Sequence, residues 1–323
     1  MAASYIISVD LGGTKILSAL INQQNEIVSR VKIATEIEKG GDVIVHAIVE
    51  SVKQVLAQNN LVQSDIKALC MGVPGTVNPY TGIIAAAPNL GLVEFNIKES
   101  LASQLSIPVL IENDVNLAGL GIKKYELKDE VKNMIVVFVG TGIGGALFFD
   151  GKIYRGSTFY AGEIGHMLVD SKGAFSISPI HSTFELTASR TAIVREIKKN
   201  IIKGKNSILR DYSKSKKPIK SKVLLDALKK EDPVVIKQLS KASRAIGTVL
   251  GSITTLLNID TIVLGGGVIE AMHEFMVPII TETFNNSVLE APGKCVKIFE
   301  TKLGDDAALY GGIALTEEFL EAN

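Results

Sequence analysis

The 323-residue chain has no tryptophan and only two cysteines, Cys70 and Cys295. Two distant cysteines cannot build a disulfide framework, nor can they supply a zinc site of four thiolates. The chain also lacks net charge, because 34 Lys and Arg balance 34 Asp and Glu. A neutral chain has no positive field to attract nucleic acid or an anionic membrane surface, so we expect neither partner.

Long apolar runs are missing as well. The uncharged stretch 245–259 is interrupted by glycine, serine, threonine and asparagine. It is also shorter than the ~18–20 apolar residues of a membrane span. The N-terminus reaches Asp10 without the basic and apolar segments of a signal peptide. We therefore expect a cytoplasmic protein. Its length suggests two domains, and its 46% hydrophobic content is enough for two cores.

Lysine and serine gather in one region, residues 203–222. A basic patch of this kind can bind nucleic acid, but no aromatic residues alternate with the lysines. Because the whole chain is neutral, we interpret this region as a solvated surface segment.

Glycine is plentiful, with 29 residues, and two glycine turns each join one apolar strand to the next. The expected flanking strands are 6–10, 16–21, 134–139 and 146–149. The two segments align in register, with Gly12 on Gly140 and Thr14 on Gly142. This similarity predicts one strand–turn–strand unit that occurs twice, once in each domain.

Backbone N–H groups of a glycine turn can converge on an anion, because no Cβ blocks the approach. Neither turn opens a helix as a dinucleotide-binding fingerprint does, and neither has the spacing of a P-loop. Two plain hairpins are the alternative. The polar side chains beside the two turns favour phosphate binding; they are Asp10, Thr14, Lys15 and Thr141. A third cluster, Gly265–Gly267, follows an expected strand at 261–264. It has two interpretations: a flat slot, walled by backbone, that could admit a purine, or a plain strand–helix loop.

Seven motifs stand in the order seen in the ROK family of bacterial repressors and sugar kinases, which the chain resembles from Ile6 to about Ala314. They are Asp10-Leu-Gly-Gly-Thr-Lys15, Gly72-Val-Pro-Gly75, Pro88-Asn-Leu90, Glu112-Asn-Asp114, Gly140-Thr-Gly-Ile-Gly-Gly145, Gly162-Glu-Ile-Gly-His166 and Leu264-Gly-Gly-Gly267. The resemblance implies an α/β, two-domain actin/hexokinase-like (ribonuclease H-like) fold with an interdomain cleft. We expect a small N-terminal domain at 1–114, completed by the C-terminal helix 306–323, and a larger domain at 115–305.

The resemblance also implies ATP-dependent phosphorylation of a hexose, with glucose to glucose 6-phosphate as the leading reaction. Asp114 would be the general base, although Asp at that position could also cap the next helix. Asp10 would help to hold Mg²⁺, through water. The residues implied for the phosphates and nucleotide are Gly12, Gly13, Thr14, Lys15, Thr141, Gly142, Gly265 and Gly266. Those implied for the sugar are Gly75, Asn89, Asn113, Glu163, His166 and Glu185.

The sequence departs from the family pattern where most members bind structural zinc with a histidine and three cysteines. The matching stretch, Ser176–Glu185, has serine and threonine at the cysteine positions. Neutral hydroxyls are poor zinc ligands, so we predict that structural zinc is absent. The same change weakens the assignment of Glu185, because this stretch positions it. The first phosphate motif begins at Asp10, so we expect neither the helix-turn-helix domain of the family's repressors nor a DNA-binding repressor.

Several alternatives stay open. The sugar could be N-acetylmannosamine, fructose or allose, and polyphosphate could be the donor. A non-catalytic sugar-sensing protein is the alternative from another class, but a sensor has no need to keep Asp10, Lys15 and Asp114 together with both glycine turns. The resemblance further implies a homodimer or homotetramer.

Overall fold

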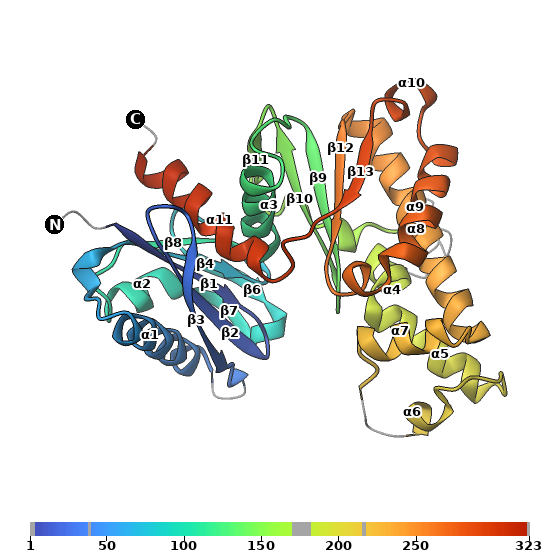
Figure 1. Cartoon of the computed structure of the whole chain (residues 1–323), viewed down its shortest axis with the longest axis horizontal. Helices are drawn as coiled ribbons and strands as arrows, with labels where there is room; N and C mark the ends of the chain where they lie inside the picture. Colours follow the sequence, from blue (N-terminus) through green and yellow to red (C-terminus); the bar gives the residue numbers. More distant parts are fainter. Residues whose placement is uncertain (1–3, 38–39, 170–181, 215–217, 322–323) are drawn as a thin grey trace. The chain divides into compact units, whose positions relative to one another are not determined.

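The structure is a computed structural model that describes residues 4–37, 40–169, 182–214 and 218–321 (Figure 1). Contacts divide the chain into two compact units. Unit 1 comprises Met1–Val131, Ile153–Ala161 and Asp305–Asn323, and unit 2 comprises Lys132–Lys152 and Gly162–Gly304.

This division differs from the boundary expected after residue 114. Helix α3 (Asp114–Tyr125) lies in unit 1, because it packs closely along helix α11 (Asp306–Thr316). A Cβ at Gly311 would lie 1.8 Å from the carbonyl oxygen of Leu117, so the two helix backbones nearly touch there. The short segment Ile153–Ala161 also returns to unit 1, although the sequence around it belongs to unit 2.

Unit 1 is built on a five-stranded sheet in the order β3-β2-β1-β4-β8. Strands β2 and β3 are antiparallel neighbours, β1 is antiparallel to β2, and β1, β4 and β8 run parallel. The strands are β1 (Tyr5–Leu11), β2 (Lys15–Ile21), β3 (Ile27–Ala34), β4 (Ile66–Val73) and β8 (Val109–Asn113). A smaller sheet contains β5 (Thr76–Val77), β6 (Ile83–Ala87) and β7 (Leu92–Asn96), which leads into α2 (Ile97–Ala102).

Alternation along β1 explains how both faces of this sheet are covered. Ile7 and Val9 point into a core shared with apolar residues of α1 (Gly41–Gln58). Ser8, between them, faces the other side, where its hydroxyl donates to the carbonyl of Ala308 on α11. Successive residues of a strand point to opposite faces, so α1 and α11 cover opposite sides of the sheet.

Unit 2 repeats the same arrangement with the sheet order β11-β10-β9-β12-β13. The strands are β9 (Met134–Val139), β10 (Ile143–Phe149), β11 (Lys152–Tyr154), β12 (Thr261–Gly265) and β13 (Lys297–Glu300). The chain passes from unit 2 to unit 1 within β11, after Lys152. As in unit 1, the first strand is antiparallel to the second and parallel to the fourth, here β12. The prediction that the strand–glycine turn–strand unit occurs twice is therefore confirmed.

Helices make up the remainder of unit 2 (Figure 1). They are α4 (Phe184–Ala188), α5 (Arg190–Ile202), α6 (Arg210–Lys214), α7 (Ser221–Lys229), α8 (Pro233–Leu257), α9 (Ile269–Ser287) and α10 (Glu290–Gly293). Residues 245–257 of the uncharged stretch form the end of α8, where Gly247 and Gly251 allow α9 to approach the helix backbone. Among the described residues, no helix combines the length and the apolar character that crossing a membrane requires.

Candidate active site

The first glycine turn lies in unit 1, between β1 and β2. The N–H of Gly12 donates to the carbonyl of Lys15 at 2.9 Å, which closes the turn. The hydroxyl of Thr35 donates to the carbonyl of Gly12 at 2.7 Å, and the backbone N–H of Thr35 donates to the carbonyl of Thr14. Thr35, directly after β3 of the same sheet, thus holds the turn, and Thr14 at the tip of the turn is exposed. A Cβ at Gly13 would lie 3.1 Å from the carbonyl oxygen of Asn89, so the sugar-binding candidate Asn89 lies beside this turn.

Asp10 stands at the end of β1, directly before the turn. Burial raises the pKa of its carboxyl to about 6, with Lys15 acting to lower it and Asp305 to raise it. Lys15 itself pairs with the carboxylate of Asp305. Within the described part of the chain, the partly buried carboxylate of Asp10 accepts no hydrogen bond, so its oxygens are available to a cation. Such a group fits a hard cation such as Mg²⁺.

Asn113 and Asp114 form the junction of β8 and α3. Asn113 caps the helix, because its side-chain oxygen accepts from the N–H groups of Val115 and Asn116 at 2.9 and 3.0 Å. Its amide nitrogen donates to the carbonyl of Gly75 at 3.0 Å. The capping role considered for Asp114 is therefore filled by Asn113, and Asp114 is the first residue of the helix.

Gly75 needs to be glycine for reasons of backbone geometry. Its φ of 102° lies in the left-handed region, and a Cβ there would lie 2.3 Å from the carbonyl oxygen of Ala86. In the structure Gly75 supports Asn113 through its carbonyl, which is a structural role beside the sugar-binding role that the resemblance implies.

A buried ion network that the sequence reasoning missed supports this junction. The Nε of Arg155 donates to Glu112 at 2.6 Å, and its two terminal nitrogens donate to Glu318 at 2.7 and 3.0 Å. The other oxygen of Glu112 accepts from the N–H of Asn113 and from the side chain of Asn116. Burial alone would lower the pKa of Arg155, but its hydrogen bonds and charge interactions with Glu318 and Glu112 raise it overall, so Arg155 is charged. No local pattern marks Arg155, because its partners lie far away in the sequence.

The second glycine turn lies in unit 2, between β9 and β10, and α4 and α5 hold it. Glu185 of α4 accepts from the N–H of Ile143 at 2.8 Å, and a Cβ at Gly142 would lie 2.2 Å from the same carboxylate. The guanidinium of Arg190, the first residue of α5, donates to the hydroxyl of Thr141 at 2.6 Å. The sequence reasoning did not identify Arg190, which places a cation at this turn.

Glu163 and His166 lie together in unit 2, around the short 3₁₀ helix η4 (Ile164–His166). Burial raises the pKa of Glu163; His166 acts to lower it and Glu185 to raise it. The imidazole of His166 is 3.7 Å from the Glu163 carboxylate and its side chain is 78% exposed, so His166 is not a structural core residue. Gly162 and Gly165 allow this segment to lie against β10, since a Cβ at either would lie 2.3 Å from a β10 carbonyl oxygen.

The glycines at the end of β12, Gly265 and Gly266, are constrained by β9. A Cβ at Gly265 would lie 2.1 Å from the ring of Phe138, and Gly266, with a φ of 84°, lies against the backbone of Val139. Close packing of two strands therefore explains both glycines, whether or not a nucleotide also binds there.

Most of the stretch that replaces the family's cysteines lies outside the described residues, including Ser176, Ser178 and His181. Thr183, at the last cysteine position, is described: its hydroxyl accepts from the N–H of Leu186 at 3.2 Å and caps α4, the helix that carries Glu185. In the described ranges, no group of three His, Cys, Asp or Glu side chains is placed to hold a metal ion.

Each unit thus brings its own candidates together. In unit 1, Asp10, Gly75, Asn113 and Asp114 lie at the carboxyl ends of the parallel strands β1, β4 and β8, where ligands of α/β sheets bind. In unit 2, the candidates surround the turn between β9 and β10. Two α/β units of equal topology, each with a glycine turn after its first strand, define the actin-like class of nucleotide-binding proteins.

Comparison with known proteins then identifies the family. The chain matches the ROK family over residues 6–318 and belongs to it. It is 30% identical over 316 residues to a glucokinase from Halalkalibacterium halodurans, covering 97% of this chain and 94% of that one. The crystal structure of a ROK family glucokinase from Streptomyces griseus in complex with glucose and AMPPNP matches with a TM-score of 0.81 and 26% identity, over 97% of this chain and 99% of that chain.

The same fold also occurs in a regulator. The structure of a ROK family transcriptional regulator, a homolog of the E. coli Mlc protein, matches with a TM-score of 0.83 and 20% identity, over 98% of this chain and 78% of that chain. The fold is therefore shared by kinases and regulators, and the chain is a glucokinase-like member of the family.

Proposed function

We propose that this protein is an ATP-dependent sugar kinase that phosphorylates a hexose, with the 6-hydroxyl of glucose as the leading acceptor. The observation that carries the proposal is the carboxylate of Asp114 at the carboxyl end of β8, on a helix start that Asn113 caps and ties to Gly75. Both glycine turns accompany it, with Lys15 at one and Arg190 at the other. Phosphoryl transfer uses such a carboxylate together with cationic groups at phosphate-binding turns, and sugar binding alone does not require this combination.

In the proposed reaction, Asp114 takes the proton of the sugar hydroxyl as the hydroxyl oxygen attacks the γ-phosphorus. The bond from the γ-phosphorus to the oxygen that bridges it to the β-phosphate breaks, which releases ADP and the sugar phosphate. Little covalent chemistry is asked of the protein, so positioning and charge neutralisation supply the rate. Asp10 would hold Mg²⁺ through water, and the bound ion would neutralise phosphate charge.

The remaining candidates are proposed to bind the two substrates. Backbone N–H groups and side chains of Gly12, Gly13, Thr14, Lys15, Thr141 and Gly142 would bind phosphates. Arg190 is added to them, because an arginine beside a phosphate-binding turn offers charge-assisted hydrogen bonds. Gly265 and Gly266 would line the nucleotide.

Sugar hydroxyls both donate and accept hydrogen bonds, so carboxylate, amide and imidazole groups suit them. Asn89, Asn113, Glu163 and His166 are proposed for this role. Glu185 uses one oxygen to hold Ile143, which leaves its other oxygen for the sugar. We extend the proposal to a homodimer or homotetramer, which a measurement of molar mass in solution would test.

The test is ADP release from ATP and Mg²⁺ with glucose, N-acetylmannosamine, fructose and allose, and a parallel series with polyphosphate as donor. At least one hexose is expected to give turnover. Asp114→Asn should lower kcat by about 10²–10⁴-fold, as for the loss of a general base, while glucose binding by calorimetry is retained. Asp42→Asn, which changes an exposed acid on α1, is the matched control and should leave kcat unchanged.

Two results would overturn the proposal. An Asp114→Asn variant with full activity would remove the general base from the mechanism. Sugar binding without ADP release from any hexose or donor would indicate a sensor.

A further inference from the structure

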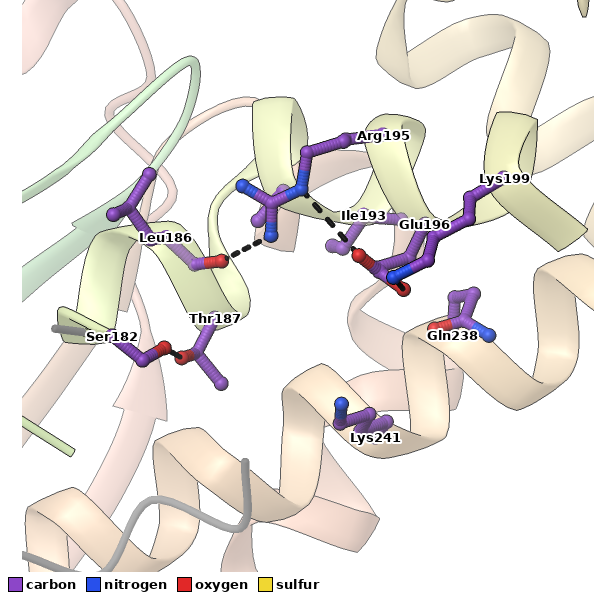
Figure 2. Close-up of a pocket in the computed structure, with 10 residues that line it drawn as sticks. Ser182, Leu186, Thr187, Ile193, Arg195, Glu196, Lys199, Gln238 and Lys241 are labelled. Atoms are coloured by element: carbon purple, nitrogen blue, oxygen red, sulfur yellow. Dashed lines mark hydrogen bonds and ion pairs between the residues drawn. The ribbon is translucent and has the colours of Figure 1, made fainter. Parts of the chain in front are cut away.

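A polar hollow of about 250 Å³ lies in unit 2 between α4, α5 and α8 (Figure 2). Its lining residues come from the end of the preceding segment and from these three helices; they are Ser182, Leu186, Thr187, Ala192, Ile193, Arg195, Glu196, Lys199, Gln238 and Lys241. Lys199 follows Arg195 by four positions on α5, and Lys241 follows Gln238 by three on α8. Residues at these spacings share a helix face, so the two pairs face each other across the hollow.

The charges in this hollow do not balance. Arg195, Lys199 and Lys241 carry three positive charges against the single carboxylate of Glu196. Glu196 holds its neighbours loosely, at 3.5 Å from Arg195 and 3.9 Å from Lys199. Lys241 has no ion pair within the described ranges. The hollow therefore has an excess of two positive charges.

Gln238 supplies a second, independent observation. The residue is only 7% exposed and lines the hollow, and its amide makes no hydrogen bond to any described residue. The atoms of this amide are not sealed from solvent, so water or a ligand in the hollow can reach them. An acceptor placed in the hollow would satisfy the amide N–H₂.

We propose that this hollow is a binding site for a phosphate group, carried either by inorganic phosphate or by the phosphate monoester of a small metabolite. Guanidinium and ammonium groups are donors without acceptor capacity, and the amide of Gln238 adds two further N–H donors. The hydroxyls of Ser182 and Thr187 also line the hollow, but Thr187 donates to the carbonyl of Thr183 at 3.0 Å and Ser182 donates to Thr187 at 2.9 Å, so the cations and Gln238 are the donors for the phosphate. The hollow is smaller than the ~300–1,000 Å³ of pockets for drug-sized ligands, which favours a small ion or ester.

The position of this site connects it to the second glycine turn. Helix α4 carries Glu185, which holds Ile143, and α5 begins at Arg190, which holds Thr141. A phosphate bound between these helices would therefore contact elements that hold the turn. The proposal does not depend on kinase activity, because the hollow is formed by other faces of α4 and α5.

The experiment is calorimetric titration of the full-length protein at low salt with inorganic phosphate and, separately, with glucose 6-phosphate. The test variant is Lys199→Gln/Lys241→Gln, which removes two cations and leaves the guanidinium of Arg195 donating to the backbone carbonyl of Leu186. The matched control is Lys203→Gln/Lys237→Gln, which removes the same charge from exposed positions of α5's end and α8.

We expect at least one of the two ligands to bind the wild-type protein and the control alike, and the test variant at least tenfold more weakly. If glucose 6-phosphate binds at least tenfold more tightly than inorganic phosphate, the ligand is the ester. Equal affinities would show that the site recognises the phosphate group alone. Equal binding by the test variant and the wild-type protein, or no binding of either ligand to the wild-type protein, would overturn the proposal. The comparison is valid even if no hexose is phosphorylated, and unchanged circular dichroism would show that the variants fold.

Discussion

Replacement of Arg155 by methionine tests the buried network next to Asp114 most directly. The Arg155 side chain is 9% exposed and Glu112 is 2% exposed, with 2.6 Å between the bonded nitrogen and oxygen. Methionine keeps much of the packing against Phe319, whose ring lies 5.7 Å from the guanidinium carbon. It removes the cation, however, and leaves the carboxylate of Glu112 buried beside two neutral donors.

The expected cost is about 3–5 kcal/mol, the usual penalty for removing one partner of a buried pair. This is a large part of the ~5–15 kcal/mol that stabilises a typical domain. Glu112→Gln alone should also destabilise, because it deprives Arg155 of a buried partner. In the double variant neither charge is left behind, and the amide oxygen of Gln can still accept from Asn113 and Asn116. The double variant should therefore cost clearly less than the sum of the two single variants. Glu318→Gln, at a partner that is 36% exposed, should cost about 1 kcal/mol or less.

The assay is urea unfolding of the four variants, followed by circular dichroism and analysed as a double-mutant cycle. Costs that add within about 0.5 kcal/mol would show that Arg155 and Glu112 do not interact, and would refute this reasoning. Activity provides a second readout. If the network positions Asp114, Arg155→Met lowers kcat and leaves the KM for ATP unchanged. A loss of folded protein alone would give the same apparent change, so kcat is expressed per folded molecule. A kcat per folded molecule equal to that of the wild-type protein would show that the network does not position Asp114.

Three further predictions concern single positions. Burial raises the pKa of Asp10 from 3.8 to about 6, so the ionised carboxylate is less stable in the folded than in the unfolded ligand-free protein. The free energy of unfolding therefore falls as the pH rises from 3.8 through about 6. Asp10→Asn should then stabilise the ligand-free protein by about 2–3 kcal/mol at pH 7 and by much less below pH 4, and equal stability of the two proteins in urea at pH 7 would contradict this. Cys70 is buried, and burial raises the pKa of its thiol to about 12, whereas Cys295 is exposed, so a thiol reagent should modify only Cys295 in the native protein and both residues in denaturant. Gly311→Ala should destabilise by about 1–3 kcal/mol in thermal unfolding, because the new Cβ meets a carbonyl oxygen at 1.8 Å; a gain in stability, as for an exposed helix position, would show that α3 and α11 separate easily.

Local patterns predicted much of each unit. The strand expected at 134–139 is β9, and the strands around both glycine turns lie where the apolar runs stand. The repeat in the sequence predicted the repeat in topology, because an apolar strand, a glycine turn and a second apolar strand specify a hairpin through neighbouring residues alone. The order of seven motifs predicted the family, which the comparison confirmed. The roles of the candidate residues stay predictions.

Contacts between distant segments are what the sequence could not show. Residues 153–161 belong to unit 1 although their neighbours on both sides belong to unit 2, and Arg155 therefore bonds to Glu112 and Glu318 across 43 and 163 positions. Arg190, at the start of α5, likewise bonds to Thr141 across 49 positions.

The sequence by itself determined the elements, the duplicated unit and the family, because these depend on periodicity, turn residues and motif order along the chain. Tertiary structure alone decided that Asn113 rather than Asp114 caps α3, that Glu185 holds the second glycine turn, and that the charged side chains of α5 and α8 face one another. The physical reason is that hydrogen bonds and ion pairs act over a few ångströms in space, and a chain can bring any two of its positions to that distance.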